Sequence, residues 1–245
     1  MSMPTTPNTG GPVLIVGGFA SNARQYEPLR ASLAAVSGCP VAVAPINLID
    51  WIGVMASDSY GTLLRILDMA VHAAMADHGD RPVTLVAHSA GGVLARIYLG
   101  DQPYGPRRLC YHGHQHVRSL ITLGTPHSAV GRGRQGGLNQ IAYAQSLYPG
   151  AYWPTLHYVS VIGKGVLGAP DGAPPERGAW MSYRILGVDG AQWGDGVVPL
   201  ENGLLDGSRK LVIPGLRHDD RPDRPWYGSS AAIIRAWWER AVAAD

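Results

Sequence analysis

The sequence predicts a single α/β domain with a mainly parallel central sheet, helices on both faces of the sheet, and a short cap. Three observations support this prediction. The chain has 245 residues, of which 46% are hydrophobic, enough for one domain with a substantial core. Short continuous apolar runs recur along it, as is typical of strands covered on both faces. Segments with helical periodicity separate these runs, and such alternation favours a parallel sheet.

The expected elements follow one another in a regular order. Strands are expected over residues 12–17, 41–46, 82–88, 117–124, 156–162 and 209–214. Helices are expected over residues 26–36, 57–78, 90–99 and 231–243. The second of these helices has the clearest pattern, because its apolar residues repeat with the 3.6-residue period of an amphipathic helix.

Charge and cysteine content narrow the class of protein. The net charge of +2 is too small to indicate a nucleic-acid partner. The first residues lack the basic and apolar regions of a secretory signal, and no segment has the roughly 18 apolar residues of a membrane span. Cys39 and Cys110 are interpreted as two reduced thiols, with a single disulfide as the alternative. We therefore expect a cytoplasmic protein, with peripheral contact to a membrane as a further expectation.

The most informative segment is Ala87-His-Ser-Ala-Gly-Gly92, which follows an expected strand and begins an expected helix. A G-x-S-x-G signature in this context forms a nucleophile elbow, a tight turn that exposes a serine hydroxyl above the sheet. Small neighbours are required there because strand and helix nearly touch. Ala87 replaces the first glycine, which the size constraint tolerates. Ser89 is the predicted nucleophile, and the alternative is a strand-to-helix turn with a capping serine.

A serine needs a base, and the base needs a carboxylate to orient it. In folds of this class the acid and then the histidine follow the serine along the chain. Asp195, on a glycine-flanked loop, and His218, after the last expected strand, satisfy this order. The rival acids are Asp189, Asp206 and Asp219, which are interpreted as solvated loop carboxylates or caps. His88 and His127 are interpreted as structural, hydrogen-bonded residues.

Two backbone N–H groups should bind the oxyanion of a tetrahedral intermediate. One is that of Ala90, the residue after the nucleophile. The other is expected from the glycine-containing loop after the first strand, from Phe19 or alternatively from Gly18. Glycines at this place would let the backbone approach the substrate.

Two further stretches, 128–155 and 163–181, show little periodicity. Residues 1–11 are expected to be a flexible N-terminus and 12–245 the single domain, with 128–155 inserted as a cap or lid. Its aromatic residues Tyr143, Tyr148 and Trp153 are expected to contact the substrate. The alternative is a static surface excursion whose aromatic side chains complete the core.

Three histidines at alternate positions, His112, His114 and His116, form a rival constellation. They would share one face of a strand and could hold a metal ion. The segment is more typical of a polar loop, and no cysteine or carboxylate converges on it in the sequence. We therefore predict no metal and no cofactor.

With these residues identified, the chain resembles bacterial and plastid lipase-like α/β hydrolases, distant relatives of the GPI inositol-deacylase and lecithin:cholesterol acyltransferase groups. The resemblance runs over residues 12–240. Its segments are 86–92, 96–100, 123–127, 148–150, 193–199 and 226–228. It implies the α/β-hydrolase fold, triad roles for Ser89, Asp195 and His218, and a lipid or lipophilic ester as substrate.

The predicted function is that of a lipase or esterase that cleaves lipophilic esters through an acyl-enzyme intermediate. The expected partner is the ester substrate itself, with a transient membrane-surface contact and with no nucleic acid or obligate protein partner. An acyltransferase or thioesterase with the same three residues is the first alternative. A non-catalytic ligand-binding protein is the second, since a fold does not imply a function.

Overall fold

A computed structural model of the protein describes residues 10–129 and 138–243. The described residues form a six-stranded parallel sheet in the order β2-β1-β3-β4-β5-β8, and a separate antiparallel pair, β6 and β7. The strands are β1 (Val13–Val16), β2 (Val41–Val43), β3 (Val83–His88), β4 (Val117–Leu123), β5 (His157–Lys164), β6 (Val166–Gly168), β7 (Gln192–Gly194) and β8 (Arg209–Pro214). The α-helices are α1 (Glu27–Ser37), α2 (Leu48–Ser57), α3 (Gly61–Ala76), α4 (Ala90–Tyr98), α5 (Leu138–Leu147), α6 (Pro174–Ile185), α7 (Leu200–Gly203) and α8 (Ala231–Val242). Two short 3-10 helices, η1 (Ala23–Tyr26) and η2 (Gly113–Gln115), complete the set.

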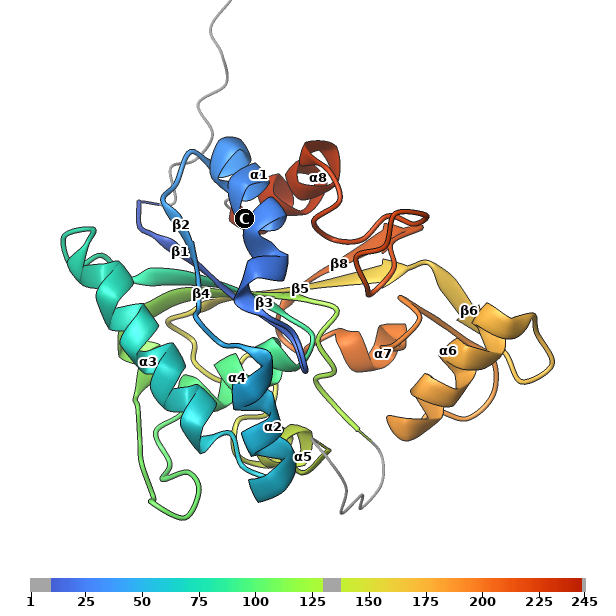
Figure 1. Ribbon diagram of the computed structural model, residues 1–245, viewed down its shortest axis with the longest axis horizontal. Helices are drawn as coiled ribbons and strands as arrows, with labels where there is room; N and C mark the ends of the chain where they lie inside the picture. The colour runs from blue at the N-terminus through green and yellow to red at the C-terminus, as the bar shows by residue number, and fades with distance from the viewer. Residues whose placement is uncertain (1–9, 130–137, 244–245) are drawn as a thin grey trace, which may run out of the picture.

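Helices cover both faces of the central sheet (Figure 1). Helices α1 and α8 pack together on one face, and α3, α4 and α5 lie on the other. Successive residues of a strand point to opposite faces. In β1, Val13 and Ile15 join the core under α1 and α8, whereas Leu14 and Val16 join the core under α3 and α4. The predicted α/β class with a parallel sheet is therefore confirmed.

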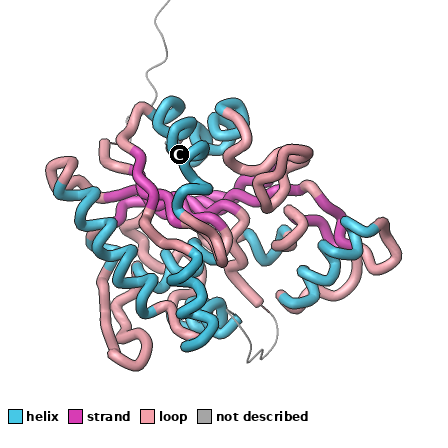
Figure 2. Tube along the Cα trace, viewed as in Figure 1, coloured by secondary structure: helices cyan, strands magenta, loops and turns pink. Residues whose placement is uncertain are grey.

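The six expected strands are the six strands of the central sheet, which crosses the middle of the molecule in Figure 2. The sequence-based boundaries differ most between residues 48 and 61. The helix expected from residue 57 begins at Gly61, and Ser57 ends a separate helix, α2. Asp58 separates the two helices because its backbone is left-handed, with φ at 49°. The stretch expected to be irregular, 163–181, contains β6 and part of α6.

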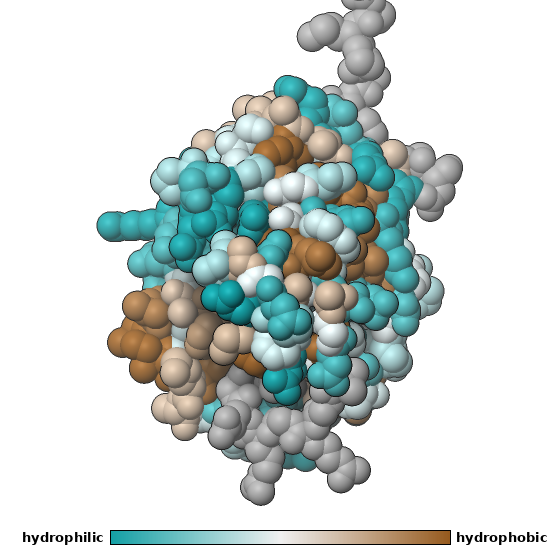
Figure 3. Space-filling model, turned by 90° about the vertical axis from the view of Figure 1, so that its right-hand side faces the viewer, coloured by the Kyte–Doolittle hydropathy of each residue, from teal (hydrophilic) through white to brown (hydrophobic). Residues whose placement is uncertain are grey.

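Helix α2 exposes an apolar face. Its side chains of Leu48, Ile49, Ile52 and Met55 are between 49% and 72% exposed. Ile49, Ile52 and Met55 follow one another at intervals of three residues and Leu48 lies four before Ile52, spacings that place them on one side of the helix. In Figure 1, α2 lies at the front of the molecule, in its lower half. The front of that view forms the left margin of Figure 3, where hydrophobic side chains gather at the lower left. In the described part of the chain, no helix is long and apolar enough to cross a membrane.

Helix α4 lies unusually close to the sheet because glycines line the contact. A Cβ atom on Gly92 would lie 2.0 Å from the Thr125 hydroxyl oxygen, far inside contact distance. That hydroxyl donates a hydrogen bond of 2.9 Å to the carbonyl of Ser89. The close approach therefore positions the turn that contains Ser89.

Gly92→Ala should destabilise the fold through this overlap. We expect the free energy of unfolding to fall by about 1–3 kcal/mol, as for other overpacked sites. Gly178 in α6 is the matched control, because a Cβ there meets nothing within 4 Å. Gly178→Ala should raise the free energy of unfolding by about 0.5–1 kcal/mol, since alanine is the better helix former. Denaturant titration checks both, and an equal response of the two variants would contradict the prediction.

Candidate active site

Ser89 occupies the sharp turn between β3 and α4. Its backbone has φ at 52° and ψ at −128°, a conformation that residues other than glycine rarely adopt. Gly91 permits the turn, since a Cβ there would lie 2.6 Å from the carbonyl oxygen of Val16 in β1. The turn places the Ser89 hydroxyl beyond the carboxyl end of β3. The N-terminus of α4 favours negative charge at this point.

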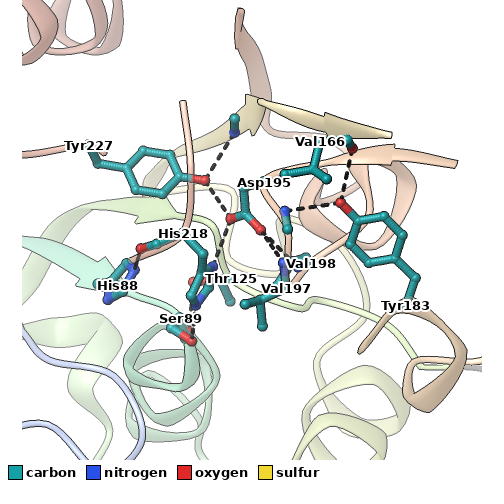
Figure 4. Close-up of polar contacts among 12 residues, drawn as sticks. His88, Ser89, Thr125, Val166, Tyr183, Asp195, Val197, Val198, His218 and Tyr227 are labelled. Atoms are coloured by element: carbon teal, nitrogen blue, oxygen red, sulfur yellow. Dashed lines mark hydrogen bonds and ion pairs between the residues drawn. The ribbon is translucent and has the colours of Figure 1, made fainter. Parts of the chain in front are cut away.

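The structure brings together the three predicted residues Ser89, Asp195 and His218 (Figure 4). The Ser89 Oγ lies 2.9 Å from His218 Nε2, and His218 Nδ1 lies 2.7 Å from Asp195 Oδ2. The Nδ1–H donates to the carboxylate, so Nε2 is the nitrogen that accepts from the serine hydroxyl. His218 follows β8 and Asp195 follows β7, and both loops converge on the end of β3. A hydroxyl, an imidazole and a carboxylate that are hydrogen-bonded in this order can act as a nucleophile, a base and an orienting acid.

Asp195 is a buried carboxylate with four hydrogen-bond donors. It is 1% exposed. Its Oδ1 accepts from the backbone N–H groups of Val197 and Val198, at 3.0 and 2.8 Å. Its Oδ2 accepts from His218 and, at 2.7 Å, from the Tyr227 hydroxyl. Burial alone would raise the pKa of Asp195, but His218 and the other donors hold it below its usual value, so the carboxylate stays ionised.

The rival acids lie elsewhere. The side chains of Asp189 and Asp206 are 95% and 94% exposed, and that of Asp219 is 53% exposed. Asp219 follows His218 in the chain but is not the carboxylate that contacts its imidazole. The structure therefore does not bring these three carboxylates to the base.

His218 is buried and its protonated form is favoured by its partner. Burial alone would lower the pKa of His218, but the charge of Asp195 and its hydrogen bond outweigh burial and raise it. An imidazole whose cation is stabilised in this way is suited to take a proton during a reaction.

Two tyrosines that the sequence did not indicate hold the acid in place. The Tyr227 hydroxyl donates to Asp195 and accepts from the Gly163 N–H at 3.0 Å. The Tyr183 hydroxyl accepts from the Gly196 N–H, also at 3.0 Å. Their roles depend on contacts between distant parts of the chain, and the one sequence signal is that Tyr227 lies in a segment of the family resemblance.

Two backbone N–H groups near Ser89 are available for an oxyanion. Within the described residues, neither Phe19 nor Ala90 donates its backbone N–H to another protein atom. The N–H of Gly18, the alternative donor, is occupied, because it donates to the Tyr26 hydroxyl at 2.9 Å. Gly18 instead allows close approach, since a Cβ there would lie 2.8 Å from the Cβ of Ser89. The geometry therefore favours the pair Phe19 and Ala90.

A cavity of about 390 Å³ opens beside the hydroxyl of Ser89. Its lining includes Phe19, Tyr26, His218 and Trp226. A larger cavity of about 610 Å³ lies between β2 and α3, but it contains none of the three converging residues. The smaller cavity is therefore the one that adjoins the Ser89 hydroxyl and the His218 imidazole.

The predicted cap falls partly outside the described residues, because 130–137 lie there. Its described part includes α5, which packs against α4. The buried guanidinium of Arg96 joins the two helices by donating to the carbonyls of Ala144 and Tyr148, at 3.2 and 2.7 Å. This anchoring attaches the described part of the segment to the α4 side of the domain.

The three aromatic residues predicted to bind substrate do not line the cavity at Ser89. Tyr148 is 3% exposed, and its hydroxyl accepts from the backbone N–H of Gln102. Trp153 stacks on His114 with ring centroids 3.7 Å apart, and the Tyr143 hydroxyl donates to a backbone carbonyl at 3.4 Å. These side chains pack against the protein, as in the alternative interpretation of the segment.

The alternate histidines are spread over different contacts. The ring of His114 stacks on the ring of Trp153, and His114 Nδ1 lies 3.0 Å from the backbone carbonyl oxygen of Leu99. His116 contacts the ring of His72, with centroids 4.6 Å apart. Across residues 10–129 and 138–243, no group of three or more His, Cys, Asp or Glu side chains is placed to hold a metal ion.

Comparisons with known proteins agree with this architecture. A lipase from Bacillus licheniformis, BlEst2, is 16% identical and aligns over 99% of this chain and 94% of its own, with a TM-score of 0.59. Phospholipase PlaB from Legionella pneumophila is 14% identical over 95% of this chain and 59% of its own, with a TM-score of 0.61. A monoacylglycerol lipase from Paleococcus ferrophilus is 11% identical over 96% of both chains, with a TM-score of 0.50. At such identities the likeness is one of fold.

None of the curated proteins compared with the sequence matches it. A family model described as alpha/beta hydrolase fold matches residues 11–150, more than half of the chain. The matched region contains β1, β3 and the turn at Ser89. The chain therefore belongs to the alpha/beta hydrolase fold family.

Proposed function

We propose that the protein is a serine-dependent carboxylic ester hydrolase, a lipase or esterase that acts on lipophilic esters through an acyl-enzyme. One observation carries the proposal. The hydrogen-bonded series Ser89–His218–Asp195 opens onto a cavity beside the N–H groups of Phe19 and Ala90. These are the parts that acyl transfer to a serine requires.

The proposed reaction begins when the Ser89 Oγ attacks the ester carbonyl while His218 Nε2 takes the hydroxyl proton. The carbonyl oxygen becomes an oxyanion that the N–H groups of Phe19 and Ala90 stabilise. Asp195 stabilises the imidazolium and keeps the ring oriented. His218 then donates the proton to the leaving alcohol, and an acyl-enzyme remains. A water molecule, activated by the same base, releases the acid and restores the serine.

A lipophilic substrate is supported by the surface next to this cavity. Phe19, which lines the cavity and is 53% exposed, contacts the ring of Trp51 in α2 with centroids 5.6 Å apart. The exposed apolar side chains Leu48, Ile49, Ile52 and Met55 belong to the same helix as Trp51. An acyl chain that leaves the cavity along α2 would remain in contact with apolar groups. The exposed apolar face of α2 would also make transient contact with a lipid surface.

The proposed role of α2 predicts a change in chain-length preference. The double variant Ile49→Gln/Ile52→Gln should lower the ratio of kcat/KM on long-chain to short-chain p-nitrophenyl esters about tenfold. A tenfold change in this ratio corresponds to about 1.4 kcal/mol of lost apolar contact. The control is Met181→Gln/Ile185→Gln on α6, where both side chains are 64% exposed. The control should leave the ratio unchanged, and an equal fall in both variants would contradict the role of α2.

The activity itself is tested on the wild-type protein. A fluorophosphonate probe should label it, and it should hydrolyse a series of p-nitrophenyl esters. Adding an alcohol or thiol acceptor to the same assay measures acyl transfer. Predominant transfer in water would favour the acyltransferase alternative, and preferential cleavage of thioesters the thioesterase alternative. Absence of both labelling and turnover would overturn the proposal.

A further inference from the structure

A second polar network lies next to Ser89 and is formed by the side chains of Tyr26 and His88. Tyr26 ends η1 and His88 immediately precedes Ser89, and both are buried, with 4% and 8% of their surfaces exposed. The Tyr26 hydroxyl lies 2.9 Å from the Gly18 N–H nitrogen and 2.9 Å from His88 Nδ1. The other ring nitrogen, His88 Nε2, lies 3.2 Å from the backbone carbonyl oxygen of His218.

One arrangement of protons satisfies every group in this network. The Gly18 N–H can only donate, and the His218 carbonyl can only accept. His88 must therefore carry its proton on Nε2, and its bare Nδ1 must accept from the Tyr26 hydroxyl. Burial, together with the nearby His218, lowers the pKa of His88 to about 3, so the ring is neutral at ordinary pH. The direction of the hydrogen bonds is thereby fixed.

The network joins the two parts of the site that must be aligned. Gly18 precedes Phe19, the residue whose N–H is placed to bind the oxyanion. The carbonyl of His218 belongs to the residue whose ring acts as the base. Trp226 contacts both rings of the network, with centroids 6.3 Å from Tyr26 and 5.7 Å from His88. Catalytic groups of this kind must be held to about 0.5 Å, which hydrogen-bonded neighbours with fixed rotamers can provide.

We propose that Tyr26 and His88 are positioning residues. Through hydrogen bonds to Gly18 and His218, they align the loop that contains Gly18 and Phe19 with the imidazole of His218. The inference rests on the proposed function, because it concerns the same serine and histidine. Packing alone does not account for the two side chains. Burying a phenol and an imidazole is costly unless each polar atom has a partner, and here each polar atom has one.

Tyr26→Phe removes the hydroxyl and keeps the ring. It leaves the Gly18 N–H and His88 Nδ1 without partners. We expect kcat to fall about 10- to 100-fold, less than the roughly 10²–10³-fold loss caused by removing an oxyanion donor itself, because the donor is displaced and not removed. KM should change less than about twofold, because alignment matters in the transition state rather than in substrate binding. The rate of labelling by a fluorophosphonate should fall in parallel, and the affinity for a trifluoromethyl ketone should fall more than that for the product acid.

Tyr104→Phe is the matched control. Its buried hydroxyl likewise accepts a backbone N–H, that of Tyr60, and donates to a side chain, that of Gln140. Tyr104 does not line the cavity at Ser89. Both variants should lose similar melting temperature, whereas kcat should fall only in Tyr26→Phe. Equal kinetics in the two variants would overturn the inference.

Variants of His88 separate its hydrogen bond to Tyr26 from its hydrogen bond to His218. Asn can present an oxygen near the position of Nδ1 and so keep the link to Tyr26, whereas Gln can present an N–H near Nε2 and keep the link to His218. His88→Asn and His88→Gln should therefore retain more kcat than His88→Leu. Equal kcat in all three would overturn the inference, even if Tyr26→Phe failed to fold. Wild-type protein that neither labels nor turns over would instead contradict the proposed function.

Discussion

Ser89→Ala should lower kcat on p-nitrophenyl esters by about 10⁶-fold, as loss of the nucleophile does in serine hydrolases with a complete triad. The effect is large because no acyl-enzyme can form without the hydroxyl, and His218 then has no proton to accept. Residual turnover should come from the oxyanion donors alone. Fluorophosphonate labelling, followed by mass spectrometry, should disappear in the variant and map to Ser89 in the wild type.

Ser160→Ala and Ser128→Ala are the controls for this variant. Ser160 is fully buried, and its hydroxyl contacts that of Ser208 at 2.8 Å, so it cannot reach a substrate. The backbone carbonyl of Ser128 accepts from the side chain of Asn202. Labelling that persists in Ser89→Ala and disappears in either control would show that the nucleophile had been misplaced.

Asp195→Asn should lower kcat by about 10⁴-fold while the fold is kept. The amide of asparagine cannot accept the Nδ1 proton as a carboxylate does, so the ring of His218 is held in the wrong tautomer. The acid limb of kcat/KM should also move to lower pH. The charge of Asp195 raises the pKa of His218, and an imidazole without that charge stays neutral to lower pH.

Asp206→Asn and Asp189→Asn test whether the effect is specific. Their side chains are 94% and 95% exposed, so the loss of charge should leave both kcat and the acid limb unchanged. A larger loss in either control than in Asp195→Asn would mean that another carboxylate orients the base. Circular dichroism and melting temperature confirm that each variant is folded.

The central sheet and the three converging residues could be predicted because their signals are local. A parallel strand is a short apolar run, and Ser89 and His218 lie in or near loops that follow such runs, whereas Asp195 is marked by its glycine-flanked loop. Chain order then selected the acid and the base from several candidates. The continuous apolar run of β1 is a signal of this kind, since it can be recognised without knowledge of the rest of the chain.

The sequence indicated that His88 is a structural, hydrogen-bonded residue, but the partners of the supporting residues could not be predicted, because those contacts join distant segments. Tyr26 and His88 are separated by 62 residues, and Tyr227 and Asp195 by 32. The sequence shows that residues 128–155 contain aromatic side chains, which favour apolar contacts. It does not show which residues they contact. Trp153 finds that contact on His114 rather than in the cavity at Ser89.

The order of Ser89 and His218 along the chain has a consequence for the protein during its synthesis. Ser89 is translated 129 residues before His218. Ribosomes add about 5–20 residues per second, so the serine exists for about 6–26 s before the histidine is made. During this interval its hydroxyl would be no more reactive than that of any free serine. His218 follows β8, the strand at one edge of the sheet, so the nascent chain would stay inert until that strand is added.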